Sequence, residues 1–115
     1  MITGIHHIAI IVSSEKSIDF YRKLGFTEIY RKERQYDTVV IMKCADLELE
    51  LFVDPNHPPR AVNPENTGYR HIALKTDDFD EAVKQFNCDK VMTDWFGKRF
   101  VNIFDPDGIP IEIHE

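Results

Sequence analysis

The sequence predicts an α+β fold made of two copies of one strand–helix–three-strand module. The first observation is a repeated tract, HHIAII at residues 6–11 and RHIALK at 70–75, each just before a helix-like pattern. The second is an offset shared to within two residues, since His7 and His71 are 64 residues apart and Glu50 and Glu112 are 62 apart. The third is size, because 115 residues with 43% hydrophobic content suit one compact domain. A recurring module explains the recurring tract.

The first half contains one expected helix between expected strands. A β-branched run at 5–12 predicts a buried strand, and Ser13 and Ser14 then offer an N-cap. Apolar residues follow at helical spacing until Gly25, a residue type that commonly ends helices. Three further strands are expected, at residues 26–31, 38–43 and 47–53.

The second half repeats this order. A strand at 70–75 precedes Asp78, which forms a predicted capping box with Glu81 at the start of a second helix. Strands are expected at 90–93, 99–104 and 109–114, the last two separated by the turn sequence DPDG. We therefore expect a single domain over residues 1–115, with module one at 1–53, a proline-rich linker at 54–68 and module two at 69–115.

Charge and composition exclude several classes of partner. With 14 basic and 20 acidic residues the net charge is −6, which disfavours non-specific binding to nucleic acid. No apolar stretch is long enough to cross a bilayer, and no signal peptide is recognisable. Cys44 and Cys88 form no CxxC pair, as expected of a protein in the reducing cytoplasm. We expect a cytoplasmic protein without nucleic-acid or membrane partners.

Strand alternation places the repeated histidines and glutamates on matching faces. His7 shares a face with Ala9, whereas the bulky aliphatic residues between them point to the other face and must pack on the helix. His71 stands in the same relation to its strand. Glu50 and Glu112 each alternate with aliphatic residues, so both carboxylates face away from the helices. Two imidazoles and two carboxylates at matching positions predict a metal site.

The donor types indicate which metals suit this site. Imidazole nitrogen and carboxylate oxygen favour borderline to hard divalent ions, and the missing thiolates argue against a structural zinc cluster. A single strand histidine is more often structural, so the prediction rests on four residues sharing one offset. His6 is expected on the face opposite His7, and His57 and His114 are expected at the surface.

Several segments together resemble the vicinal oxygen chelate superfamily, which includes glyoxalase I, bleomycin-resistance proteins, extradiol dioxygenases, fosfomycin-resistance enzymes and methylmalonyl-CoA epimerase. The segments are HHIAI, SIDFYRKLGF, LELELF, GYRHIAL and FDPDGIPIEIHE, and the resemblance covers nearly the whole chain. Within the superfamily the chain looks most like small bacterial proteins of the lactoylglutathione lyase type. The resemblance implies paired βαβββ modules that form a half-open barrel around a divalent metal.

Carried over by motif, the resemblance implies four metal ligands: His7, Glu50, His71 and Glu112. This set is similar to that of glyoxalase I, whereas dioxygenases and fosfomycin enzymes typically use two histidines and one glutamate. It implies one divalent ion per site (nickel, cobalt, zinc or manganese), with Glu112, or else Glu50, as the catalytic base. The resemblance also implies a homodimer, and it leaves open whether the ligands of one site come from one chain or two.

Two positions depart from the glutathione-dependent members. Ile11 stands where those proteins commonly carry a glutathione-binding arginine, and Asp54 stands where they often carry asparagine. Glutathione is anionic, so a lost arginine and a gained acid weaken the case for that substrate. Lys98 and Arg99 are candidates for an alternative contact with an anionic substrate.

The expected activity is that of a metal-dependent lyase or isomerase. Its substrate would be a small molecule with adjacent oxygens, and the reaction would pass through an enediolate. Two alternatives remain open: a resistance protein of the same fold that sequesters a small molecule without catalysis, or another metal-dependent epimerase or dioxygenase of the superfamily.

Overall fold

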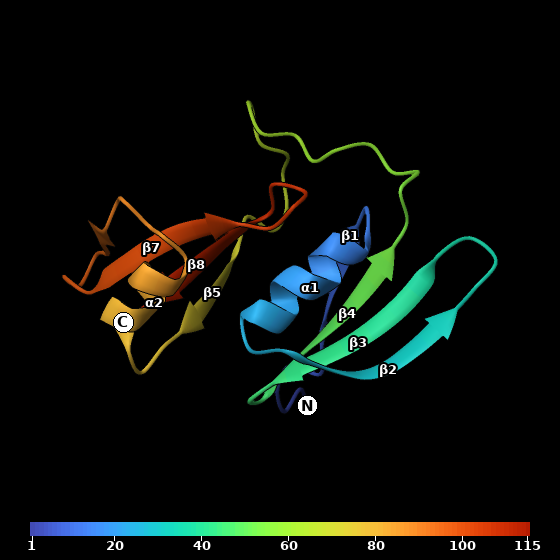
Figure 1. Cartoon of the computed structure of the whole chain (residues 1–115), viewed down its shortest axis with the longest axis horizontal. Coiled ribbons are helices and arrows are strands. Elements are labelled where there is room, and N and C mark those ends of the chain that lie inside the picture. The colour runs from blue at the N-terminus through green and yellow to red at the C-terminus, as the bar shows by residue number, and fades with distance from the viewer. The chain divides into compact units, whose positions relative to one another are not determined.

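The computed structural model describes all residues from 1 to 115, and the chain divides into two compact units. The first unit spans Met1–Pro59 and the second Arg60–Glu115. In Figure 1 the first unit runs from blue to green and the second from olive to red. The first unit contains β1 (Ile8–Val12), α1 (Glu15–Lys23), β2 (Thr27–Glu33), β3 (Thr38–Cys44) and β4 (Leu47–Val53). The second contains β5 (Ile72–Lys75), α2 (Phe79–Gln85), β6 (Met92–Thr93), β7 (Arg99–Phe104) and β8 (Pro110–His114).

The two units have the same sheet topology. The first sheet has the order β1-β4-β3-β2 and the second the order β5-β8-β7-β6 (Figure 1). In each sheet the strand before the helix pairs in parallel with the last strand, and the other pairings are antiparallel. The prediction of an α+β fold from two βαβββ modules is confirmed.

Alternation separates a buried face from an open face in the first sheet. Val12, Leu49 and Leu51 are buried, as are Ile18 and Tyr21 on the apolar side of α1. On β1, Ala9 and Ile11 are exposed, and on β4 the neighbours of Leu49 and Leu51, including Glu50, are partly exposed. The face that carries the candidate ligands is therefore the face away from the buried core, as expected.

The second unit has a core of the same kind. Ile111 and Ile113 of β8 and Val101 of β7 are buried, together with Phe79 and Ala82 of α2. Their alternate neighbours on β8, Glu112 and His114, stay partly exposed and share the other face. None of the helices is long and apolar enough to span a membrane.

Three strands begin two or three residues later than the sequence predicts. The first pairs in the parallel ladders are Ile8 with Leu49 and Ile72 with Ile111, so the residues at 5–7 and 70–71 precede their strands. Similarly, β6 pairs only through Met92 and Thr93. Strand ends depend on the hydrogen-bonding partner and not on local β propensity alone, which explains these differences.

Both helices begin at the predicted N-caps. The Ser14 hydroxyl accepts a hydrogen bond from the Lys16 amide at 3.3 Å, and an Asp78 carboxylate oxygen accepts one from the Glu81 amide at 3.1 Å. The second half of the predicted capping box is absent, because the Asp78 amide donates to the Thr76 hydroxyl instead, at 3.1 Å. The cap is therefore an aspartate cap supported by threonine.

Removing the Asp78 cap is expected to destabilise the protein. Asp78→Ala leaves the Glu81 amide without its acceptor and should lower the free energy of unfolding by about 1 kcal/mol, within the usual range of about 0.5–2 kcal/mol. Urea denaturation measures the loss. Asp77→Ala removes the same charge from an exposed neighbour and should change the free energy much less; equal losses would show that charge, not capping, is responsible.

Candidate functional site

In the first unit, the β1–β4 pairing brings His7 to Glu50. Ala9 lies opposite Glu50 in the parallel ladder, and His7 is two residues before Ala9. Two-residue steps along a strand keep side chains on one face. The imidazole Nε2 of His7 accordingly lies 3.1 Å from a carboxylate oxygen of Glu50.

His6 does not lie on the opposite side from His7, contrary to expectation. The Nδ1 atoms of the two rings are 3.0 Å apart, and the rings meet edge to face. Alternation extends to His7, which directly precedes β1 and meets Glu50 as expected, but not to His6, which is one residue further from the strand. The His7 Nε2 and the Glu50 carboxylate oxygen are adjacent nitrogen and oxygen donors on one face, a donor type suited to a divalent metal ion.

The second unit repeats the arrangement. Ala73 lies opposite Glu112 in the β5–β8 ladder, and His71 is two residues before Ala73. The Nε2 of His71 is in direct contact with a carboxylate oxygen of Glu112. Each module thus derives one His–Glu pair from the same register of parallel strands.

Within either unit, no three His, Cys, Asp or Glu side chains form a group that could hold a metal ion. Each unit contributes one nitrogen and one oxygen donor, a combination suited to borderline or hard divalent ions. The binding of one ion by all four residues stays a prediction.

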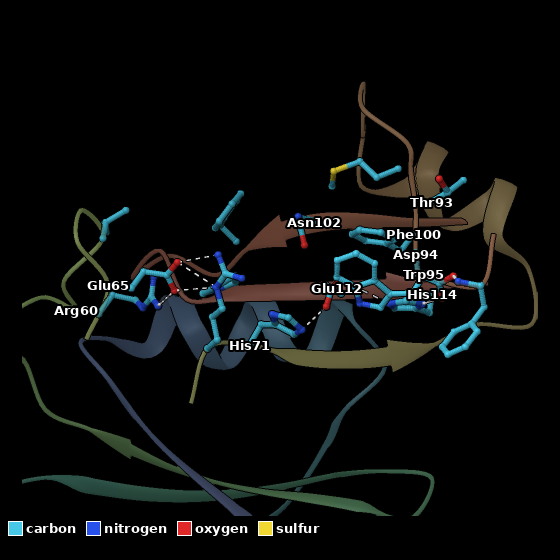
Figure 2. A pocket seen from close by; sticks show the side chains of 16 residues that line it. Arg60, Glu65, His71, Thr93, Asp94, Trp95, Phe100, Asn102, Glu112 and His114 are labelled. Atoms are coloured by element: carbon cyan, nitrogen blue, oxygen red, sulfur yellow. Dashed lines mark hydrogen bonds and ion pairs between the residues drawn. The ribbon is translucent and has the colours of Figure 1, made fainter. Parts of the chain in front are cut away.

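The second unit carries a cleft of about 720 Å³ on its open sheet face. Figure 2 shows Glu112 near the middle, with His71 on one side and aromatic rings on the other. Beyond His71 lie Arg60 and Glu65. The cleft is lined by sixteen residues, which come from β6, β7, β8, the β6–β7 turn and the segment before β5. Its volume is typical of small-molecule sites.

His114 was expected at the surface, but it lines this cleft. Its Nε2 lies 3.5 Å from a Glu112 carboxylate oxygen, and its ring stacks on Phe100 with centroids 5.1 Å apart and planes 10° apart. The sequence did contain a signal for this position, because alternation places Pro110, Glu112 and His114 on one strand face. That signal is stronger than the closeness of His114 to the chain end.

Sequence reasoning also missed the aromatic turn between β6 and β7. Asp94 organises this turn, because one of its carboxylate oxygens accepts hydrogen bonds from the Phe96 amide at 2.8 Å and the Lys98 amide at 2.9 Å. These backbone donors hold the pKa of Asp94 below its ordinary value. Trp95 and Phe96, both lining the cleft, are carried at the tip. The sequence signal that could have indicated this aromatic turn was the pair of adjacent aromatic residues directly before Gly97.

The Asp94 turn predicts a pH-dependent contribution to stability. A carboxyl whose pKa is lowered by folding stabilises the native state above its unfolded pKa of about 3.9, and this contribution is lost as the pH falls through the folded pKa. The difference in unfolding free energy between wild type and Asp94→Asn should therefore be constant above about pH 5.5 and shrink in more acidic solution. Urea denaturation at a series of pH values tests this; a difference independent of pH would contradict it.

Arg99 has no place in the cleft. Its guanidinium pairs with Glu115 at 2.9 Å and with Asp80 at 3.0 Å, and it lies over the Phe79 ring, 4.6 Å from the centroid. On β7, Arg99 alternates with Phe100, which does line the cleft. Lys98 is exposed and does not line the cleft. Contact of either residue with an anionic substrate stays a prediction that this geometry does not favour.

The arginines of the cleft are Arg60 and Arg70. Both lie against one carboxylate: Arg70 donates to Glu65 at 3.0 Å, and an Arg60 nitrogen lies 3.6 Å from it. The Glu65 carboxylate partly neutralises the positive charge of Arg60 and Arg70. Arg70 in turn holds the pKa of Glu65 below its ordinary value.

The sequence as a whole matches one protein-family model. Residues 4–113 fit the model described as Glyoxalase/Bleomycin resistance protein/Dioxygenase superfamily. The chain belongs to this family. The resemblance inferred from the sequence motifs is thereby confirmed, as is the fold class.

Similar proteins span the same length. The uncharacterized protein YwkD of Bacillus subtilis (strain 168) is 40% identical over 126 residues, which cover 100% of this chain and 98% of YwkD. Among solved structures, a glyoxalase family protein from Enterococcus faecalis is 34% identical with a TM-score of 0.88, covering 97% of each chain. A lactoylglutathione lyase from Agrobacterium tumefaciens is 26% identical with a TM-score of 0.73, covering 100% of this chain and 95% of that one.

Proposed function

We propose that this family member is a divalent-metal-dependent lyase or isomerase that moves a proton on a small substrate with two adjacent oxygens. The observation that carries the proposal is the duplicated His–Glu pair, His7 with Glu50 and His71 with Glu112, formed by the same strand register in both modules. A repeated pair of donors on an open face has no evident use in packing either core.

His7, Glu50, His71 and Glu112 would hold the ion. A divalent ion bound there would supply Lewis-acid stabilisation of negative charge on the two substrate oxygens. The protein's own task is then to take a proton from the adjacent carbon, which gives an enediolate, and to return it to the neighbouring carbon.

Glu112 is the better candidate for the base. Its side chain is 12% exposed, against 27% for Glu50, so it is more shielded from water. It lines the cleft in which a substrate would lie, and both His71 and His114 contact its carboxylate oxygens. These two contacts can hold the carboxylate in place while it exchanges a proton with the substrate.

Glutathione is not favoured as the thiol part of the substrate. Ile11 is exposed on β1 and offers no charge for an anionic group. Asp54 adds negative charge at the end of β4, where it pairs with His57 at 3.2 Å. We therefore propose a substrate that is a hemiacetal of another thiol or a thiol-free molecule with adjacent oxygens.

Metal analysis tests the proposal. Protein purified without a tag should contain about one nickel, cobalt, zinc or manganese ion per site, and His7→Ala and His71→Ala should each weaken metal binding by more than about tenfold. His57→Ala is a matched control, because His57 is an exposed histidine of the first unit that pairs with Asp54. Metal content that both ligand variants retain in full would contradict the proposal.

A sequestering role without catalysis is the second candidate, favoured by the aromatic lining of the cleft. Such a protein would bind a small apolar molecule without consuming it. Turnover assays on thiol hemiacetals of methylglyoxal, combined with metal analysis, separate the two: a metal-free protein that binds ligand without turnover supports sequestration.

A further inference from the structure

We propose that the aromatic end of the second unit's cleft is a subsite for a flat, preferably aromatic group of the substrate that carries no negative charge. This inference rests on the proposed function and specifies its substrate class. The aromatic wall is formed by Trp95, Phe96, Phe100 and His114, all of which line the cleft.

The wall is flat and adjoins the candidate base. Phe100 and His114 stand parallel, with their planes 10° apart. The outer edge of His114, its Nε2, is 3.5 Å from Glu112. A group stacked against these rings would place the atoms next to it beside the Glu112 carboxylate, where the proposed proton transfer takes place (Figure 2).

Trp95 and Phe96 are largely exposed to water, and a bound ligand would cover them. Trp95 is 97% exposed and Phe96 86% exposed, so two large apolar side chains meet water at the edge of the cleft. Their turn is ordered, because Asp94 binds the amides of Phe96 and Lys98, and a further bond joins the Asp94 amide to the Lys98 carbonyl at 2.8 Å. An ordered turn presents these rings with little loss of backbone entropy on binding.

Charge at this end disfavours an anionic group. Acidic side chains lie on both sides of His114, with Asp94 at 3.8 Å and Glu112 at 3.5 Å. An anionic group would be repelled there, whereas Arg60 lies at the other end, beyond His71 (Figure 2). The cleft therefore has a polar reactive centre flanked by an aromatic subsite that disfavours anionic groups.

Binding of two related hydroxy acids tests the subsite. Mandelate and lactate share the adjacent hydroxyl and carboxylate oxygens and differ by a phenyl in place of a methyl group. For the full chain with Mn²⁺ added, calorimetry should give a mandelate affinity at least about tenfold higher than that of lactate. Trp95 is the chain's single tryptophan, so its emission should change with mandelate and much less with lactate.

Two variants test whether the aromatic wall causes the preference for mandelate. Trp95→Ala should reduce the mandelate preference to about threefold or less while lactate binds as before, and Phe100→Leu, which keeps apolar volume but loses the flat ring, should act in the same direction. Tyr36→Ala removes another largely exposed aromatic ring, from the first unit, and should change neither affinity.

Four results would overturn the inference. Equal affinity for the two acids, or a preference that survives both variants, overturns the subsite while the proposed metal chemistry stands. Failure of both acids to bind contradicts the subsite and the proposed function together. If the emission of Trp95 without ligand shifts to longer wavelength on dilution, the aromatic turn lies in an interface between copies of this chain.

Discussion

Replacing Glu112 by glutamine is expected to lower turnover by about 10²–10⁴-fold, the usual contribution of a positioned general base. Glutamine has nearly the same shape but cannot accept the substrate proton. Its amide oxygen can still act as a ligand, so the variant should retain part of its metal. Turnover of a thiol hemiacetal of methylglyoxal and metal content are to be measured on the same sample, so that loss of the base is separated from loss of the ion.

The comparison with Glu50→Gln decides between the two bases. If Glu112 is the base, Glu50→Gln should lower metal affinity more than it lowers the turnover of metal-saturated protein. Glu33→Gln, at an exposed position of β2, serves as the control and should behave like wild type. Unchanged turnover in Glu112→Gln would remove this residue from the mechanism, and a larger loss in Glu50→Gln would move the base to the first unit.

The order and kind of the secondary-structure elements follow from local sequence. Each predicted strand and helix has its counterpart in the structure, and β4 and β7 have the predicted bounds, Leu47–Val53 and Arg99–Phe104. The errors concern ends such as Ile5 and Lys90, where apolar or extended sequence continues but no partner strand is available for pairing. Pairing partners come from distant parts of the chain, so local patterns cannot define them.

The two His–Glu pairs were predictable because each follows from alternation and from one repeated register. His7 meets Glu50 and His71 meets Glu112, as shared faces require. His6 was misplaced because it is one residue further from β1 than His7, which directly precedes the strand and keeps its alternation. The convergence of both pairs on one ion stays a prediction, since alternation assigns a side chain to a face but does not determine what that face meets.

The aromatic wall shows a different limit of sequence reasoning. Trp95 and Phe96 belong to a turn, where no periodicity assigns side chains to a face. Their position depends on the Asp94 carboxylate, which binds two amides of the same turn. Arg99 illustrates the converse case, because its place on the helix side of β7 follows from alternation with Phe100, a pattern already present in the sequence.

Truncation of Ile18 is expected to have the largest effect on stability among the changes considered for the first unit. Ile18 is 1% exposed and belongs to the buried side of α1, so Ile18→Ala removes buried methyl and methylene groups and leaves a cavity. The expected loss in the free energy of unfolding is about 2–5 kcal/mol. Alanine has the higher helix propensity, which offsets the loss by only a few tenths of a kcal/mol. The measured value therefore reports packing.

Ile5→Ala provides the matched control for this core prediction. Ile5 is 76% exposed and precedes β1, so the same truncation removes little buried area and should cost about 0.5 kcal/mol or less. Urea denaturation of both variants, followed by circular dichroism, gives the two values. A loss in Ile18→Ala no greater than that in Ile5→Ala would mean that α1 does not pack on the first sheet through this side chain. The open face that carries His7 and Glu50 would then lack the support from the buried side on which its geometry depends.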